Sequence, residues 1–406
     1  MDDQAREIGR RVRYWRLRRN LSRQHFADMV GRSVSWVDKV ETGERALLRL
    51  PMLERVAEVL EVEPTVLADA PAARLAENCV DPVEVQAIRA ALGRYPSLSA
   101  NERPGPPPTV EQVRRQLEHV DHAWLSSHFR VVARHLPRLI GEAQLAEMTA
   151  SLADQGRAGR ALVVAYRLAS SMLLKFERTD VAWLAADRAM HTALKREDTV
   201  ALARATRSVA RAMTDTGQRD EAIEVLIGMA DRMRPELATR EHELLSLYGM
   251  LLLPVSIAAA GKDDPALAFA MHQEATAAAV RIGPQHESHN TIFGPTNVAL
   301  HRIAALVRLH EPGQALDHAR GIQPTELGAL PPERKVNYFL DTTTALAGVG
   351  RYQDAARALG EAEQVAPEEV RCRPLAHGLL RSLLSNTHGE PGRLVRQMAD
   401  RAGVTV

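Results

Sequence analysis

The stretch from Leu21 to Arg45, LSRQHFADMVGRSVSWVDKVETGER, decides the fold of the first part of the chain. Ser22 and Ser33 each precede a short run with helical spacing, and a serine side chain caps a helix by accepting a hydrogen bond from a free backbone N–H group. Gly31 lies between the runs, where the first helix must end in a left-handed turn. The stretch therefore predicts two short helices joined by a tight turn.

The charge around this stretch is uneven. Residues 1–50 carry twelve Arg and Lys against seven Asp and Glu, although the net charge of the whole chain is only +1. Residues 51–69 reverse the sign, with one Arg against five acids. A basic face on a small domain is the electrostatic footprint expected for a surface that contacts DNA phosphates.

The same stretch resembles the phage-repressor/Cro family of helix-turn-helix domains, also called the XRE type, over about residues 5–69. The positions that carry this resemblance are Leu21-Ser22, Phe26-Ala27, Gly31-x-Ser33, Val37, Val40 and Glu41-x-Gly43-x-Arg45. It implies a five-helix DNA-binding domain at residues 1–70. It also implies that Arg16 and Glu41 form a structural pair between the first and third helices.

The resemblance implies that the second helix of the motif enters the major groove. Val34 and Ser35 at its start are expected to face bases, and Lys39 one turn later reaches a guanine or a phosphate. For Val34, contact with a thymine methyl and simple exposure to solvent are both open. The residues expected near phosphates are Arg23, Ser33, Trp36 and Arg45.

Composition limits the class of protein. The 406 residues are 45% apolar and only 4% aromatic, with two cysteines, so we expect two or three soluble domains without a disulfide framework. The N-terminus has no apolar signal core, and the longest apolar stretch, 244–260, is broken by Pro254 and short of a membrane span. We therefore expect a cytoplasmic, nucleoid-associated protein.

Only five of its 52 basic residues are lysines, which, with the abundant alanine, suggests a GC-rich genome.

The rest of the chain predicts helices, so the expected fold class is all-α. NERPGPPPT at 101–109 cannot continue a helix and predicts a linker within a helical and proline-rich segment, 71–110. Within residues 111–406 a turn followed five residues later by alanine recurs at Gly156, Glu177, Gly217, Gly261, His310 and Gly350. These units resemble long, degenerate tetratricopeptide repeats, and a generic α-solenoid is the alternative.

Stacked helical hairpins form a superhelix whose concave groove is lined by the first helix of each pair. Two positions before each turn face this groove in the tetratricopeptide family. In the later units they supply Arg204, Ser208, Tyr248, Leu252, Asn297, His301, Asn337 and Asp341. The loop 283–297 lengthens one unit and adds Phe293. Asparagine offers both donors and an acceptor, which favours a ligand-binding groove over a merely hydrated wall.

No motif for catalysis, for a cofactor or for a metal site is visible in the sequence. His286 and His289 have no second ligand pair at a suitable spacing, so we interpret them as ordinary loop histidines.

The domain order resembles that of actinobacterial XRE-type transcription regulators with a tetratricopeptide-like sensor domain. This resemblance implies a homodimeric DNA-binding regulator whose repeat domain binds a small signal molecule or a short peptide. Two alternatives stay open. The repeats act as a protein–protein adaptor without a small ligand, or, with less support, the helical array is an enzyme.

Overall fold

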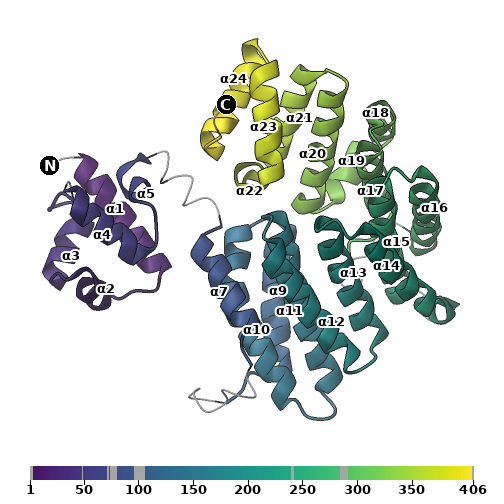
Figure 1. Cartoon of the computed structure of the whole chain (residues 1–406), viewed down its shortest axis with the longest axis horizontal. Helices are drawn as coiled ribbons and strands as arrows, with labels where there is room; N and C mark the ends of the chain where they lie inside the picture. Colours follow the sequence, from purple (N-terminus) through teal and green to yellow (C-terminus); the bar gives the residue numbers. More distant parts are fainter. Residues whose placement is uncertain are drawn as a thin grey trace. The chain divides into compact units, whose positions relative to one another are not determined.

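The computed structural model describes residues 3–47, 49–70, 73, 80–95, 106–238, 242–283 and 291–404. Every regular element in these ranges is helical, which confirms the predicted all-α class (Figure 1). The chain divides into two units, Met1–Cys79 with Asp400–Thr405, and Val80–Ala399 with Val406. We call them the N-terminal unit and the helical array. Of the predicted linker 101–109, residues 101–105 lie outside the described residues.

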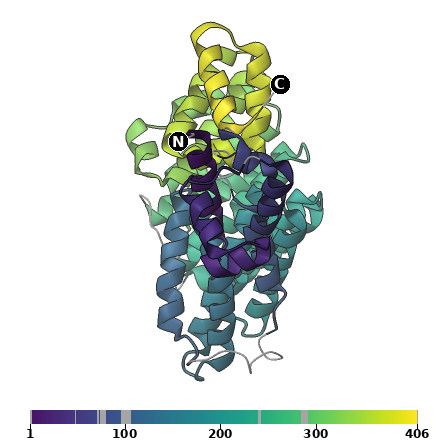
Figure 2. The same cartoon turned by 90° about the vertical axis from the view of Figure 1, so that its left-hand side faces the viewer.

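The N-terminal unit is a bundle of short helices, coloured purple in Figures 1 and 2. Its described helices are α1 (Asp3–Arg18), α2 (Arg23–Val30), α3 (Val34–Glu41), α4 (Leu50–Leu60) and α5 (Pro64–Ala68). Apolar residues at helical spacing meet in one core, in which Trp15, Phe26, Val37 and Leu60 are at most 2% exposed. Burial of such side chains contributes about 1.5–3 kcal/mol each, and this core holds α2 and α3 in place.

The helical array is built from consecutive antiparallel pairs of helices. The helices of the remaining chain are α7 (Pro82–Leu92), α9 (Val110–Leu125), α10 (Phe129–Thr149), α11 (Gln155–Lys175), α12 (Thr179–Leu194), α13 (Thr199–Asp215), α14 (Arg219–Met233), the 3₁₀ helix η2 (Arg234–Ala238), α15 (Glu243–Ala260), α16 (Pro265–Ile282), α17 (Pro295–Arg308), α18 (Pro312–Arg320), α19 (Pro324–Ala329), α20 (Pro332–Gly348), α21 (Tyr352–Val365), α22 (Pro367–Cys372), α23 (Pro374–Asn386) and α24 (Gly389–Ala402).

The pairs stack through the first helix of each pair. Helices α11, α13, α15, α17 and α20 each contact the next in this series, and α11, α13, α15, α17 and α20 also pack on α12, α14, α16, α18 and α21. Fully buried alanines, such as Ala182, Ala185 and Ala189 on α12, let helices approach closely. This packing explains how an array with few aromatic residues fills its core. None of the described helices combines the length and apolarity needed to cross a bilayer.

The array curls so that its early helices meet later ones. Helix α9 contacts α20. The Ser127 hydroxyl between α9 and α10 donates a hydrogen bond of 3.1 Å to the Glu369 carboxylate on α22. The backbone N–H of Arg130 donates to Glu368, also at 3.1 Å. Lys175 at the end of α11 contacts Glu369 as well, and its Nζ lies 2.9 Å from Glu333 Oε1 on α20. Of these residues, Lys175 and Glu333 also line the cavity described below.

Candidate DNA interface and candidate ligand cavity

Local hydrogen bonds fix the turn between α2 and α3. The Ser22 hydroxyl accepts a hydrogen bond of 3.1 Å from the His25 N–H at the start of α2. Gly31 ends that helix at φ 72°, a left-handed conformation that glycine adopts without steric cost. The Ser33 hydroxyl then accepts 3.2 Å from the Trp36 N–H and begins α3. The two caps and the glycine therefore act as the sequence predicted.

Helix α3 has one buried and one exposed face. Val37 and Val40 are buried in the core of the N-terminal unit. Ser35, Asp38 and Lys39 are exposed, and Val34 is 36% exposed at the first turn. The exposed residues follow helical spacing, so they form one continuous surface. Val34, Ser35 and Lys39 were the predicted base-facing residues.

A buried ion pair fastens α1 to α3. Arg16 Nε lies 2.5 Å from Glu41 Oε1, Arg16 Nη2 lies 3.0 Å from Oε2, and the side chains are 6% and 1% exposed. This two-pronged contact matches the pairing that the family resemblance implied. Arg23 Nε also donates to Glu41 Oε2, at 3.1 Å, and Arg23 Nη2 lies 3.4 Å from Asp38. The predicted phosphate contact Arg23 is therefore already partly neutralised by two carboxylates.

Two other predicted DNA contacts, Trp36 and Arg45, lie in contrasting environments. Trp36 is only 8% exposed, and it packs in the core while Arg32 stacks 5.9 Å above its ring. The Trp36 side chain therefore packs in the core of the N-terminal unit. The sequence pattern did not predict this burial. Arg45 is exposed after α3, and its backbone N–H donates 2.8 Å to the Lys39 carbonyl.

A cavity of about 910 Å³ lies in the helical array. It is lined mainly by the first helices of the pairs, α11, α13, α15, α17 and α20, as the superhelix interpretation predicted for a groove. Four predicted ligand residues line it, namely Asn297 and His301 on α17 with Asn337 and Asp341 on α20. Its volume lies in the range of pockets that bind small molecules.

The hydrogen bonds of these four residues differ. Asn297 is fully buried, and its Oδ1 has no hydrogen-bond partner among the described residues. Both polar atoms of the Asn337 amide have partners, because its Nδ2 donates to Glu333 and its Oδ1 accepts from Arg373. Burial raises the pKa of Asp341.

His301 is a neutral group in this cavity. Its Nδ1 lies 2.8 Å from the Asn297 carbonyl oxygen, so Nδ1 carries the hydrogen and Nε2 is an acceptor. Burial lowers the pKa of His301 to about 3, and the cations Arg334 and Arg207 act in the same direction. His301 therefore supplies hydrogen bonds to this cavity at physiological pH and no charge.

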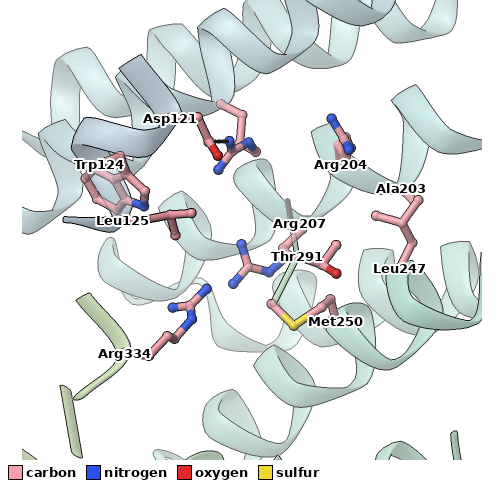
Figure 3. Close-up of a pocket in the computed structure, with 11 residues that line it drawn as sticks. Asp121, Trp124, Leu125, Ala203, Arg204, Arg207, Leu247, Met250, Thr291 and Arg334 are labelled. Carbon is pink, nitrogen blue, oxygen red and sulfur yellow. Dashed lines mark hydrogen bonds and ion pairs between the residues drawn. The ribbon is translucent and has the colours of Figure 1, made fainter. Parts of the chain in front are cut away.

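The other five predicted ligand residues do not line the large cavity. Arg204 borders a small adjoining pocket of about 40 Å³ (Figure 3). Ser208 bonds the backbone of its own helix, Leu252 is 1% exposed, and Tyr248 donates to Glu274. Phe293 is fully buried against Gly249, where a Cβ would lie 2.0 Å from the ring. Tyr248, Leu252 and Phe293 therefore belong to the packing between helices.

The difference has a geometric cause in the register of each helix. The sequence prediction used one fixed distance from the turn for every unit. On α17 and α20 the residues at this distance line the cavity, but on α13 the cavity is lined by Arg207 and Arg211, three residues beyond the predicted Arg204 and Ser208. On α15 the cavity-lining residue that is nearest in the sequence to the predicted Leu252 is Pro254. A helix turns about 100° per residue, so three residues cover about 300°. A side chain three residues away therefore points about 60° from the predicted direction.

The sequence prediction missed the cationic lining of the cavity. Its cations are Arg167, Lys175, Arg207, Arg211, Arg219, Arg308, Arg334 and Arg373. A signal for them exists on α13, where Arg204, Arg207 and Arg211 recur at spacings of three and four without an acid between Thr199 and Thr214. On an otherwise alanine-rich buried helix, such a stripe marks a charged cavity. The predicted loop residues His286 and His289 lie outside the described residues.

Comparison with known proteins identifies one part of the chain. Residues 7–70 match a family described as a helix-turn-helix domain. No curated protein and no solved structure matches the chain. The N-terminal unit therefore contains a helix-turn-helix domain, the class that its two capped helices and tight turn also define.

Proposed function

We propose that this protein is a DNA-binding transcription regulator of the XRE type whose helical array, with tetratricopeptide-like pairs, binds a small signal molecule or a short peptide. The observation that carries the proposal is the exposed face of α3 in a domain that matches the helix-turn-helix family. A helix presented in this way by such a domain docks in the major groove of DNA.

In this proposal Val34 and Ser35 contact base edges, and Lys39 contacts a guanine or a phosphate. Ser33 and Arg45 contact the backbone at the two ends of α3. Arg23 contacts phosphate through the N–H groups that its contacts with Glu41 and Asp38 do not use. One such domain buries too little surface for high specificity, so we propose a homodimer that binds two half-sites about one helical turn apart.

The replacement Lys39→Ala tests the DNA interface. We expect it to weaken binding to the operator by about 1–3 kcal/mol, because it removes the exposed cation of α3. Genome-wide footprinting of the full chain supplies the operator, and titration of wild-type and variant protein at one salt concentration measures the loss. Lys262→Ala, an exposed lysine of the array, is the control and should leave affinity unchanged. Equal affinity of Lys39→Ala and wild type would contradict this interface.

Control by a ligand requires different affinities for two arrangements of the protein. The cavity offers a place for the ligand, with Asn297, His301 and Asp341 among its polar groups. We expect a low-molecular-weight fraction of the native cells to raise the melting temperature of the full chain and to change its operator affinity by about fivefold or more. If no fraction changes either quantity, the array instead acts as an adaptor for a protein partner.

A further inference from the structure

The cavity carries an excess of positive charge. Its described lining contains eight cationic side chains and four carboxylates, which are Glu177, Asp215, Glu333 and Asp341. Some of the cations have strong partners. Arg167 Nη2 lies 2.5 Å from Asp121, and both side chains are mostly buried. Arg373 lies 3.3 Å from Glu369, which also contacts Lys175. These ion pairs stabilise the wall of the cavity and neutralise the cations that belong to them.

Arg207 and Arg211 have no such ion-pair partner, although Asp215 one turn further along α13 partly favours the charged form of Arg211. Among the described residues, no carboxylate lies within ion-pair distance of either guanidinium. Arg211 donates one long hydrogen bond, 3.3 Å, to the Ser171 hydroxyl. The Nε of Arg207 is buried and has no hydrogen-bond partner within the described ranges. Both residues project from α13 into the cavity, one helical turn apart.

Arg334 adds a third guanidinium at the same place. Figure 3 shows the side chains of Arg207 and Arg334 turned toward each other, with Leu125 and Met250 beside them. Arg334 Nη1 contacts Glu333 at 2.9 Å, but its buried Nε is without a partner in the described structure. Burial lowers the pKa of Arg207 well below its ordinary value, and Arg211, Arg334 and Arg167 contribute to the same shift. An uncompensated cation in such a site is costly, and an anion between the guanidiniums removes the cost.

We propose that the cavity binds the oxyanion group of a small ligand, a phosphoryl or a carboxylate group, between Arg207, Arg211 and Arg334. This inference rests on the proposed ligand-binding function and names the chemical class of the ligand. Guanidinium groups are planar forks that match the oxygens of these anions. The cavity is much larger than the anion alone, so the neutral remainder of the ligand lies toward Asn297 and His301 on α17.

The test uses the full chain with sodium pyrophosphate and with citrate as probes. Isothermal titration is carried out at constant ionic strength, with sodium chloride as the balancing salt. We expect saturable binding of at least one probe, and a loss of about tenfold or more in affinity for Arg207→Gln. Arg232→Gln, an exposed arginine on α14, is the matched control and should bind as the wild type does. A preference for pyrophosphate identifies a phosphoryl ligand, and a preference for citrate identifies a carboxylate.

Two further measurements make the result decisive. Arg207→Gln should melt at the same temperature as the wild type without probe or higher, because it removes an uncompensated charge, so lost binding does not reflect unfolding. It should also keep its operator affinity, which separates this inference from the proposed function. If neither probe binds saturably, or if Arg207→Gln binds both as tightly as the wild type, the oxyanion site is wrong. If Arg207→Gln loses the probes while the probes leave operator affinity unchanged, the site stands and ligand control of DNA binding fails.

Discussion

Replacing Glu41 with alanine should destabilise the helix-turn-helix domain by about 3–5 kcal/mol. Glu41 is 1% exposed and accepts two hydrogen bonds from Arg16 and one from Arg23. Without it the Arg16 guanidinium, itself 6% exposed, is a buried charge whose one remaining hydrogen-bond acceptor among the described residues is the Leu21 carbonyl. The lost pair joins α1 to α3, so the exposed face of α3 should lose its position and operator affinity should fall as well.

Hydrogen exchange read by mass spectrometry measures this effect within the full chain. We expect faster exchange in α1 to α4 of Glu41→Ala and unchanged exchange in the helical array. Glu44→Ala removes an exposed glutamate three residues away and should leave both regions as in the wild type. Wild-type protection of α1 to α4 in Glu41→Ala would show that the pair adds no stability.

Replacing Lys175 with methionine should cost the helical array about 3–5 kcal/mol. The Lys175 side chain is 4% exposed and lies between two buried carboxylates, Glu333 at 3% and Glu369 at 0%. Its Nζ also lies 4.9 Å from the centre of the Trp124 ring. Methionine keeps most of the apolar stem but removes the charge, so both carboxylates lose a cationic partner.

The loss should depend on pH in a defined direction. Burial alone raises the pKa of Glu333, but Arg334 and Lys175 outweigh it, and the pKa in the folded protein is below its ordinary value. A carboxyl group with a lowered pKa stabilises the fold above its unfolded pKa of about 4.3, and this stability is lost as pH falls toward the folded value. The difference between Lys175→Met and the wild type should therefore be largest near pH 7 and shrink below about pH 4.

Urea unfolding at several pH values measures both effects. Lys195→Met, which replaces an exposed lysine at the end of α12, is the control and should unfold as the wild type does at each pH. A difference between Lys175→Met and wild type that stays constant from pH 7 to pH 3 would show that the lost interaction is not electrostatic.

The helix-turn-helix motif was predictable because its signals are local. Ser22, Gly31 and Ser33 each act on backbone groups within four residues, and the core pattern of Phe26, Val37 and Val40 covers only a few turns. The burial of Trp36 was not predicted, because it depends on how α3 packs against the rest of the unit. That information is tertiary and is not contained in the spacing of the motif.

The cavity was predictable only in part, and the reason lies in helix rotation. The predicted positions on α17 and α20 line the cavity, whereas on α13 and α15 the same offset from the turn indicates residues outside its lining. The Phe293 ring, for example, occupies the space beside Gly249 on α15, a contact that the spacing of the sequence does not show. The missed arginines on α13 were visible in the sequence, but their significance depends on which acids lie nearby in space.

The contacts around Lys175 and Ser127 have a consequence for how the array folds. The bond between Ser127 and Glu369 joins residues 242 positions apart, and Lys175 contacts a residue 194 positions away. Stacked repeats usually touch only their neighbours, so their stabilities add and unfolding spreads from either end. Here the early helices also depend on α20 and α22, and closing so long a loop slows folding. The array should therefore unfold as one cooperative body, and a newly synthesised chain completes this wall of the cavity only after α22 has emerged.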